Sequence, residues 1–229
     1  MSTMITTEVI ATHYCEFTCL RDAEISTGFL MGRLFHALHL TMASATPPGQ
    51  MCPFGITFPD YRSFELAAPP RRMRQNLSRD VDDGDADLDA ELPIGKRVRL
   101  FARSEQELDS IVWSKSMVGL GDYVHRTKPR PTPLAIQNFA VFARRQPKAS
   151  PERLIRRAMK RQGIDEADAI ERYEGYTMDR CRLPWVDMRS ESSQHRFRLF
   201  IDRIEMPGLT SSWGFSTYGL SRSVSMPLF

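Results

Sequence analysis

The sequence predicts an α+β fold, with a ferredoxin-like (RRM-like) βαββαβ domain over residues 1–133 and a second domain over residues 134–229. Three observations predict it. Short apolar runs and amphipathic stretches of the first half follow the order strand, helix, strand, strand, helix, which begins a ferredoxin-like unit. The segment "KPRPTP" (128–133) holds three prolines in six residues, which favours extended connecting chain. Beyond it, an arginine-rich helix precedes alternating patterns typical of antiparallel strands.

The first strand and helix have the clearest signals. "HYCEFTCL" (13–20) alternates Cys15, Phe17 and Cys19, as the buried face of a strand does. "ISTGFLMGRLFHALHLTMA" (25–43) predicts a helix that Ser26 or Thr27 can cap. Its apolar seam consists of Leu30, Leu34 and Leu38.

The sequence signals for the remaining elements of this domain are weaker. Strands are predicted at "FGITFP" (54–59) and "KRVRLFA" (96–102), a helix at "SEQELDSIVWSKSMV" (104–118), and a last strand within 121–146. Residues 63–91 are first basic and then acidic with little apolar periodicity, which predicts a mobile insertion.

Charge is distributed unevenly over the 229 residues. Residues 1–91 carry 7 Lys and Arg against 13 Asp and Glu, whereas residues 92–229 carry 24 against 15. An anion-binding surface is therefore expected in the C-terminal half. The four cysteines form no C-x-x-C pair, which favours core thiols over a metal site. Without a long apolar run or a signal peptide pattern, a cytoplasmic protein that does not enter a membrane is expected.

"SPERLIRRAMKRQG" (150–163) predicts a helix over 151–162, with Ser150 as its N-cap, Pro151 at its first position and Gly163 after its end. Its cations recur at i, i+3, i+4, i+7 and i+8 and so form one stripe: Arg153, Arg156, Arg157, Lys160 and Arg161. Like-charged neighbours on an exposed helix cost about 0.2–0.5 kcal/mol per pair. A polyanion along the stripe reverses that cost, so nucleic-acid contact is favoured over the alternative of a solvated surface face.

Further along, an acidic-capped helix is predicted near "DEADAIERY" (165–173), followed by strands at "LPWVDMRS" (183–190), "HRFRLFIDRIE" (195–205) and "WGFSTYGLS" (213–221). In the second of these strands Phe197, Leu199 and Ile201 share one apolar face.

Three blocks, "ARRQPKASPERLIRRAMKR" (143–161), "RSESSQHRFRLFI" (189–201) and "GFSTYGLSRSVSMPLF" (214–229), resemble the CRISPR-associated repeat-RNA (pre-crRNA) processing endoribonucleases of the type I-F kind. Weaker similarities occur in the same order in "FLMGRLFHALH", "FGITFPD", "LPIGKRVRLFARSEQELDSI" and "PTP". The resemblance implies a metal-independent enzyme without cofactor. It would bind the stem-loop of a CRISPR repeat, cut at the 3′ base of the stem, and stay bound as a subunit of the crRNA surveillance complex.

The resemblance also implies roles for particular residues. Arg156, Arg157, Lys160 and Arg161 would line the major groove of the stem, with Arg153 on the same cationic face. Arg144 and Gln146 match residues that bond base edges, and Phe197 matches the aromatic that stacks under the last base pair. Ser190 and Tyr218 match residues around the scissile phosphate, and Ser192 is a further candidate for RNA binding.

The catalytic histidine is ambiguous. In the family it directly precedes an "x-A-L" run on the first helix, and an ungapped comparison places Phe35 there and His36 one residue later. A one-residue shift turns a helical side chain by about 100°. His36 is the first candidate and His39, one turn beyond position 35, is the alternative. The further possibilities are another histidine, such as His13, His125 or His195, or a site that cuts without one. A stem-loop binding subunit that has lost cleavage is the second functional hypothesis, and an unrelated ferredoxin-like RNA-binding module is the third.

Overall fold

The computed structural model describes residues 13–62, 94–111, 119–147, 151–176 and 181–229. The chain forms two compact units, one of residues 1–144 with 183–229 and the other of residues 145–182. The boundary predicted after residue 133 falls inside the first unit. Residues 63–91, the N-cap Ser150 and the last part of the helix predicted over 104–118 lie outside the described residues.

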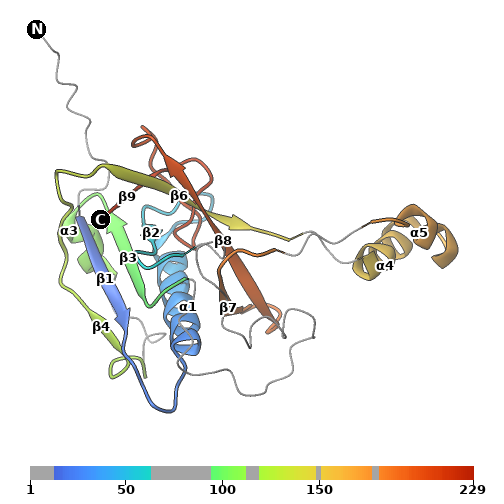
Figure 1. Ribbon diagram of the computed structural model, residues 1–229, viewed down its shortest axis with the longest axis horizontal. Helices are drawn as coiled ribbons and strands as arrows, with labels where there is room; N and C mark the ends of the chain where they lie inside the picture. The colour runs from blue at the N-terminus through green and yellow to red at the C-terminus, as the bar shows by residue number, and fades with distance from the viewer. Residues whose placement is uncertain (1–12, 63–93, 112–118, 148–150, 177–180) are drawn as a thin grey trace, which may run out of the picture. The chain divides into compact units, whose positions relative to one another are not determined.

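The first sheet is antiparallel and follows the element order predicted from the sequence (Figure 1). Its strands lie in the order β2-β3-β1-β4, and β5 also pairs with β1. The elements are β1 (His13–Cys19), α1 (Thr27–Ala45), β2 (Gly55–Thr57), β3 (Arg97–Ala102), α3 (Glu105–Ser110), β4 (Val124–Arg126) and β5 (Arg130–Pro131). The proline-rich segment is thus more than a connection, because two of its residues pair with the start of β1.

Helix α1 begins where the sequence predicts and packs closely on a strand of the second sheet. Ser26 is the N-cap, and its Oγ accepts a hydrogen bond from the Phe29 backbone N–H at 3.3 Å. The predicted seam of three leucines is buried. Gly32 allows the close approach, since a Cβ at this position would lie 2.7 Å from the backbone oxygen of Asp187.

The predicted alternation in β1 is confirmed, because Cys15, Phe17 and Cys19 are all buried in the hydrophobic core. Burial raises the pKa of Cys15 to about 11, although the nearby Arg126 opposes the shift. Burial also raises the pKa of Cys19 to about 12. These two thiols are therefore core side chains that stay protonated at neutral pH.

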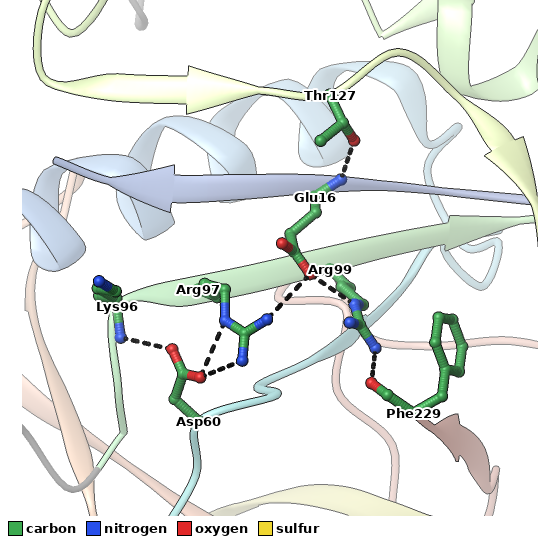
Figure 2. A network of polar contacts seen from close by, with 7 residues as sticks. All are labelled: Glu16, Asp60, Lys96, Arg97, Arg99, Thr127 and Phe229. Atoms are coloured by element: carbon green, nitrogen blue, oxygen red, sulfur yellow. Dashed lines mark hydrogen bonds and ion pairs between the residues drawn. The ribbon is translucent and has the colours of Figure 1, made fainter.

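The other face of β1 and β3 carries a network of charged side chains (Figure 2). The Arg99 Nε donates to Glu16 Oε2 at 2.7 Å, and its Nη1 donates to the backbone oxygen of Phe229. The Arg99 guanidinium also lies 4.2 Å from the centroid of the Phe229 ring. On the same face Arg97 bonds Asp60 through Nε and Nη2. Burial raises the pKa of Asp60, but the hydrogen bonds and charge of Arg97 outweigh it and lower that pKa.

The second sheet contains the strands that carry the predicted site. Its order is β7-β8-β6-β9, formed by β6 (Asn138–Arg145), β7 (Trp185–Arg189), β8 (Arg196–Met206) and β9 (Met226–Leu228). Strands β7 and β8 pair antiparallel, with Arg189 opposite Arg196. In β8, Leu199 and Ile201 are buried and Phe197 is half-buried against the core, as the alternating pattern predicts.

The strand predicted over 213–221 is wrong. Phe215 makes an isolated bridge to Cys52, and the chain then turns, with the Gly219 backbone N–H bonded to the Ser216 oxygen at 2.8 Å. Gly219 has φ 69°, a left-handed conformation that suits glycine, and a Cβ there would meet Ile56 at 2.7 Å. The last strand is β9 instead, and Tyr218 lies in the turn.

The second unit contains two helices, α4 (Pro151–Gln162) and α5 (Glu166–Arg172). Gly163 has φ 66° after the end of α4, as expected for a helix-terminating glycine. Asp165 caps α5 by accepting the Asp168 backbone N–H at 2.8 Å. Arg172 Nη1 donates to Gln162 Oε1 at 2.5 Å and so links the two helices.

Candidate active site

The predicted site residues fall into two groups. The first unit holds His36, His39, Arg144, Ser190, Ser192, Phe197 and Tyr218. The second unit holds Gln146, Arg153, Arg156, Arg157, Lys160 and Arg161. Helix α1, strands β6 and β8, the turn between β7 and β8, and the segment before β9 together supply the first group.

His39 is held on two sides by the segment that contains Tyr218. Its ring stacks on the Tyr218 ring, with the centroids 4.0 Å apart and the planes 10° apart. Its Nδ1 lies 3.0 Å from the backbone oxygen of Thr217. A carbonyl oxygen only accepts hydrogen bonds, so Nδ1 carries the proton, and in the neutral ring Nε2 carries the lone pair.

The surroundings of His39 favour its neutral form. Burial lowers its pKa, and the charges of His36 and Arg144 lower it further, while the Thr217 bond and Glu191 oppose the shift. The free pKa of histidine is about 6.5. His39 is therefore a neutral imidazole at pH 7, with a lone pair on Nε2 that can accept a proton.

His36 makes a different contact. Its Nε2 lies 3.0 Å from Oε1 of Glu191, whose side chain is 61% exposed. Because a carboxylate only accepts, Nε2 carries a proton. The other ring nitrogen, Nδ1, is buried and has no hydrogen-bond partner. Neither nitrogen of His36 thus offers an accessible lone pair in this arrangement.

The helix position before the "x-A-L" run belongs to the core. Phe35 is completely buried and packs on Phe58 with ring centroids 5.7 Å apart. Residues spaced i, i+4 and i+7 share one face of a helix. Gly32, His36 and His39 have this spacing, so the face of α1 that touches β7 also carries both histidines.

A compact turn between β7 and β8, called here the serine turn (residues 190–195), carries both predicted serines. The Ser190 backbone N–H donates to the His195 oxygen at 2.9 Å, and the Gln194 N–H donates to the Ser190 oxygen at 2.8 Å. The two serine hydroxyl oxygens, of Ser190 and Ser192, lie 3.2 Å apart. Gln194 has φ 57°, and its Nε2 donates to the Glu191 backbone oxygen at 2.7 Å. These bonds give the turn a defined shape.

Arg144 lies beside two aromatic side chains of the site, Tyr218 and Phe197. Its guanidinium carbon is 5.5 Å from the centroid of the Tyr218 ring and 5.8 Å from that of Phe197. Both distances are within the range of a cation–π contact. A fixed positive charge therefore lies beside the two aromatic residues predicted to contact RNA.

In the second unit, the cationic stripe predicted on α4 lines a groove of about 600 Å³. The lining consists of Arg153, Arg156, Arg157, Lys160 and Arg161, all of which are exposed. Gln146 is also exposed. Five cations along one groove suit a polyanion such as a nucleic-acid backbone.

Two residues that contact the first group were not anticipated from the sequence. Glu191 and Thr217 are the partners of the two histidines, and they lie 155 and 178 residues away from them in the chain. Neither residue belongs to a sequence motif that would identify it as the partner of a histidine.

Within the described part of the chain, His, Cys, Asp and Glu form no group of three or more that could hold a metal ion. No helix of the described residues is long and apolar enough to cross a membrane.

Comparison with known proteins gives consistent matches. The family model described as "CRISPR-associated protein (Cas_Csy4)" matches residues 14–229. The "CRISPR-associated endonuclease Cas6/Csy4" of Escherichia coli (strain UTI89 / UPEC) is 32% identical over 217 residues, covering 95% of this chain and 99% of the relative. The protein of the same name from Pseudomonas aeruginosa (strain UCBPP-PA14) is 29% identical over 221 residues, with the same coverage. A solved structure described as "CRISPR associated protein Cas6" has a TM-score of 0.33 at 10% identity, covering 96% of this chain and 99% of that one, a likeness too weak to use.

Proposed function

The chain belongs to the Cas_Csy4 family of CRISPR-associated proteins, and from this we propose that it is a metal-independent endoribonuclease that processes CRISPR precursor RNA. It binds the stem-loop of each repeat and cuts at the 3′ base of the stem. The names of the two relatives, both endonucleases, support nuclease activity.

The nucleophile is supplied by the RNA itself. The 2′-oxygen next to the scissile phosphate forms a bond to phosphorus while the bond from phosphorus to the 5′-oxygen breaks. The 2′-hydroxyl gives its proton to a base, and the 5′-oxygen gains a proton. The products are a 2′,3′-cyclic phosphate and a 5′-hydroxyl, so the protein has only to align the 2′-hydroxyl, move protons and stabilise charge.

His39 is the base in this proposal, in place of His36, which the sequence ranks first. The bond from its Nδ1 to Thr217 leaves the lone pair on Nε2, and its lowered pKa keeps the ring neutral. Ser190 orients the 2′-hydroxyl, and Ser192 contacts the RNA beside it; the two hydroxyl groups are adjacent. Tyr218 holds the His39 ring by stacking on it and lies near the scissile phosphate.

Binding depends on a separate set of side chains. Helix α4 enters the major groove of the stem near the open end of the stem, where an A-form groove admits a helix, and its cationic side chains contact the RNA. Arg144 and Gln146 bond base edges. Phe197 stacks under the last base pair, which is worth about 1–3 kcal/mol for one base on an aromatic ring.

The proposal extends to fold and assembly. We assign the first sheet with α1 and α3 to the ferredoxin-like class, which the element order supports. The protein keeps the cleaved stem-loop and so serves as a subunit of the crRNA surveillance complex. A stem-loop binding subunit without cleavage is the second candidate, since Phe35 fills the position where the family's histidine is expected.

The observation that carries the proposal is the His39 ring, fixed as a neutral base by Thr217 and Tyr218. The experiment incubates the protein with its repeat RNA in EDTA, beside the same RNA with a 2′-deoxy nucleotide at the cut. We expect cleavage of the first RNA, and tight binding without cleavage of the second. Tight binding with cleavage of neither RNA supports the binding subunit instead. A requirement for magnesium contradicts the mechanism.

A further inference from the structure

We infer that His36 and Glu191 form a positioning pair, which holds the serine turn against helix α1 while His36 itself moves no proton in the reaction. The inference rests on the proposed function and deepens it. It assigns roles to one residue that the sequence placed in the catalytic step and to another, Glu191, that the sequence did not single out.

Neither ring nitrogen of His36 is available to accept a proton from RNA. Nε2 donates to Glu191 Oε1 at 3.0 Å, and Nδ1 is buried without a partner. A base needs an accessible lone pair within hydrogen-bond distance of the proton that it removes. The ring of His36 offers none, whereas Nε2 of the neutral His39 does. The two histidines of α1 therefore differ in their available atoms, although they share one helix face.

The contact joins two parts of the site that must keep their spacing. The serine turn is shaped by its own hydrogen bonds, which run between residues 190 and 195. Helix α1 carries His39 and is set against β7 at Gly32. Between these parts, the bond from His36 to Glu191 spans 155 residues of sequence and ends on the residue that separates Ser190 from Ser192. Movement of the turn away from α1 would separate the serine that aligns the 2′-hydroxyl from the base that accepts its proton.

Charge gives a second reason to treat Glu191 as a positioning residue. A carboxylate beside a scissile phosphate repels the substrate, so direct contact with RNA does not explain Glu191. Its bond to His36 does explain it, because that bond directs the carboxylate toward α1. A misplacement of about 1 Å in an active site can reduce the rate about 100-fold, so a single exposed contact can matter for rate without mattering for stability.

Conservative replacements separate positioning from proton transfer. In His36→Gln the amide nitrogen can still donate to Glu191, but the side chain cannot exchange a proton with RNA. In Glu191→Gln the amide oxygen can still accept from His36. His36→Ala and Glu191→Ala remove the contact. Glu205→Ala is the matched control for Glu191, because Glu205 is an exposed glutamate on β8 that accepts a hydrogen bond from Arg203, away from the two histidines in sequence and on a different strand position from the serine turn.

The experiment measures single-turnover cleavage rates and the Kd for the 2′-deoxy repeat RNA, in EDTA and over pH 5–9. We expect His36→Gln and Glu191→Gln to stay within about fivefold of the wild-type rate. His36→Ala and Glu191→Ala should each lose about 10- to 100-fold in rate, with Kd changed less than threefold. The double variant should lose no more than either alanine variant alone, since both remove the same contact. Glu205→Ala should match the wild type.

The pH profile distinguishes the two histidines directly. The groups that face His36 are Glu191 and His39, and those that face His39 are His36, Arg144, Glu191, Thr217 and Tyr218. If His39 is the base, His36→Gln keeps an acid limb, with its midpoint at a pH no lower than in the wild type, because the charge of His36 no longer lowers the pKa of His39. A loss of about 100-fold in His36→Gln equal to that in His36→Ala, with Glu191→Ala at the wild-type rate, overturns the inference and makes His36 the proton-transfer residue.

Failure of the proposed function looks different. In that case the wild-type protein itself leaves the ribose-containing RNA uncut in EDTA. Because Glu191 is largely exposed, its variants should fold even where a change at His36 does not, and they test the contact from its other end. A Glu191→Ala rate equal to that of the wild type, in a folded protein that cuts, contradicts the positioning role without touching the nuclease assignment.

Discussion

The His39 ring lies flat against the Tyr218 ring, with the centroids 4.0 Å apart and the planes 10° apart. The backbone oxygen of Thr217, the residue next to Tyr218, holds Nδ1 of the same histidine. One short segment near the end of the chain thus fixes both the plane and the tautomer of a side chain on the first helix. Arg144 lies over the tyrosine ring as well, so the His39 imidazole, an aromatic ring and a fixed positive charge form one cluster.

Replacing Tyr218 tests whether the stacked ring holds the base. Tyr218→Phe keeps the ring, so we expect its single-turnover cleavage rate to stay within about tenfold of the wild type. Tyr218→Leu removes the ring and should lose about 100-fold, the range of a misplaced proton-transfer group. An equal loss of rate in both variants would contradict a stacking role and leave the hydroxyl group as the functional part. Wild-type rates in both variants would contradict a role for either the ring or the hydroxyl group.

The pH dependence of cleavage follows from the lowered pKa of His39. Burial is the main cause, and a neutral base is active, so the rate should rise with pH and reach half its plateau below pH 6.5. His39→Gln should cut at least about 100-fold more slowly and lack this limb. A midpoint above pH 6.5 in the pH dependence of kcat/KM of the wild-type protein, which reports the protein free of RNA, would contradict the assignment.

The same shift affects stability with a defined sign. The unfolded chain binds a proton at His39 more readily than the folded chain, because the folded pKa is the lower one. The unfolding free energy should therefore fall as pH drops below 6.5 and continue to fall until the folded pKa is passed. In urea unfolding at pH 7 and pH 5, His39→Gln should lose less stability between the two pH values than the wild type does.

Arg99 should matter for stability rather than for cleavage. It is 8% exposed and holds Glu16 and the Phe229 backbone oxygen, so Arg99→Met removes the nearer of two arginines from the Glu16 carboxylate and leaves Arg97 Nη1 at 3.8 Å (Figure 2). Removing one partner of a buried pair costs about 3–5 kcal/mol of unfolding free energy, and because Arg97 remains we expect a loss toward the lower end of that range. Lys96→Met, an exposed change of the same charge, is the control and should cost less than about 1 kcal/mol. Equal costs in urea unfolding would contradict the importance of the network.

The cationic groove of α4 predicts the salt dependence of RNA binding. Replacing Arg156 or Arg157 by alanine should weaken binding of the repeat stem and reduce the slope of log K against log salt by about 1. Arg172→Ala on α5 changes the net charge equally, but this arginine bonds Gln162. Its slope should match that of the wild type. A slope that changes equally in all three variants would indicate a general charge effect.

Much of this fold could be predicted because local patterns specify it. The alternation of Cys15, Phe17 and Cys19, the cap at Ser26 and the cationic stripe of α4 each depend on neighbours within a few residues. The strand predicted over 213–221 failed for a local reason as well. Glycines at 214 and 219 take conformations outside the strand region, and apolar residues between them satisfy the strand pattern without forming a ladder.

The site could be predicted only in part, because its decisive contacts are distant in sequence. Helix periodicity places His36 and His39 on one face and cannot distinguish them. Their hydrogen-bond partners distinguish them. Nε2 of His36 bonds Glu191, 155 residues away in the chain, whereas Nδ1 of His39 bonds Thr217, 178 residues away. The sequence therefore indicates the helix face, while the proposal of His39 as the base depends on the tertiary contacts.

The chemical identity of the cut end tests the central claim most directly. After wild-type protein cuts its repeat RNA in EDTA, mass spectrometry of the fragment upstream of the cut distinguishes a 2′,3′-cyclic phosphate from a 3′-hydroxyl by the mass of the phosphate group. Attack by the 2′-hydroxyl with His39 as base predicts the cyclic phosphate, with a 5′-hydroxyl on the other fragment. A 3′-hydroxyl paired with a 5′-phosphate would contradict this account, because it requires attack by water on phosphorus while the bond from phosphorus to the 3′-oxygen breaks.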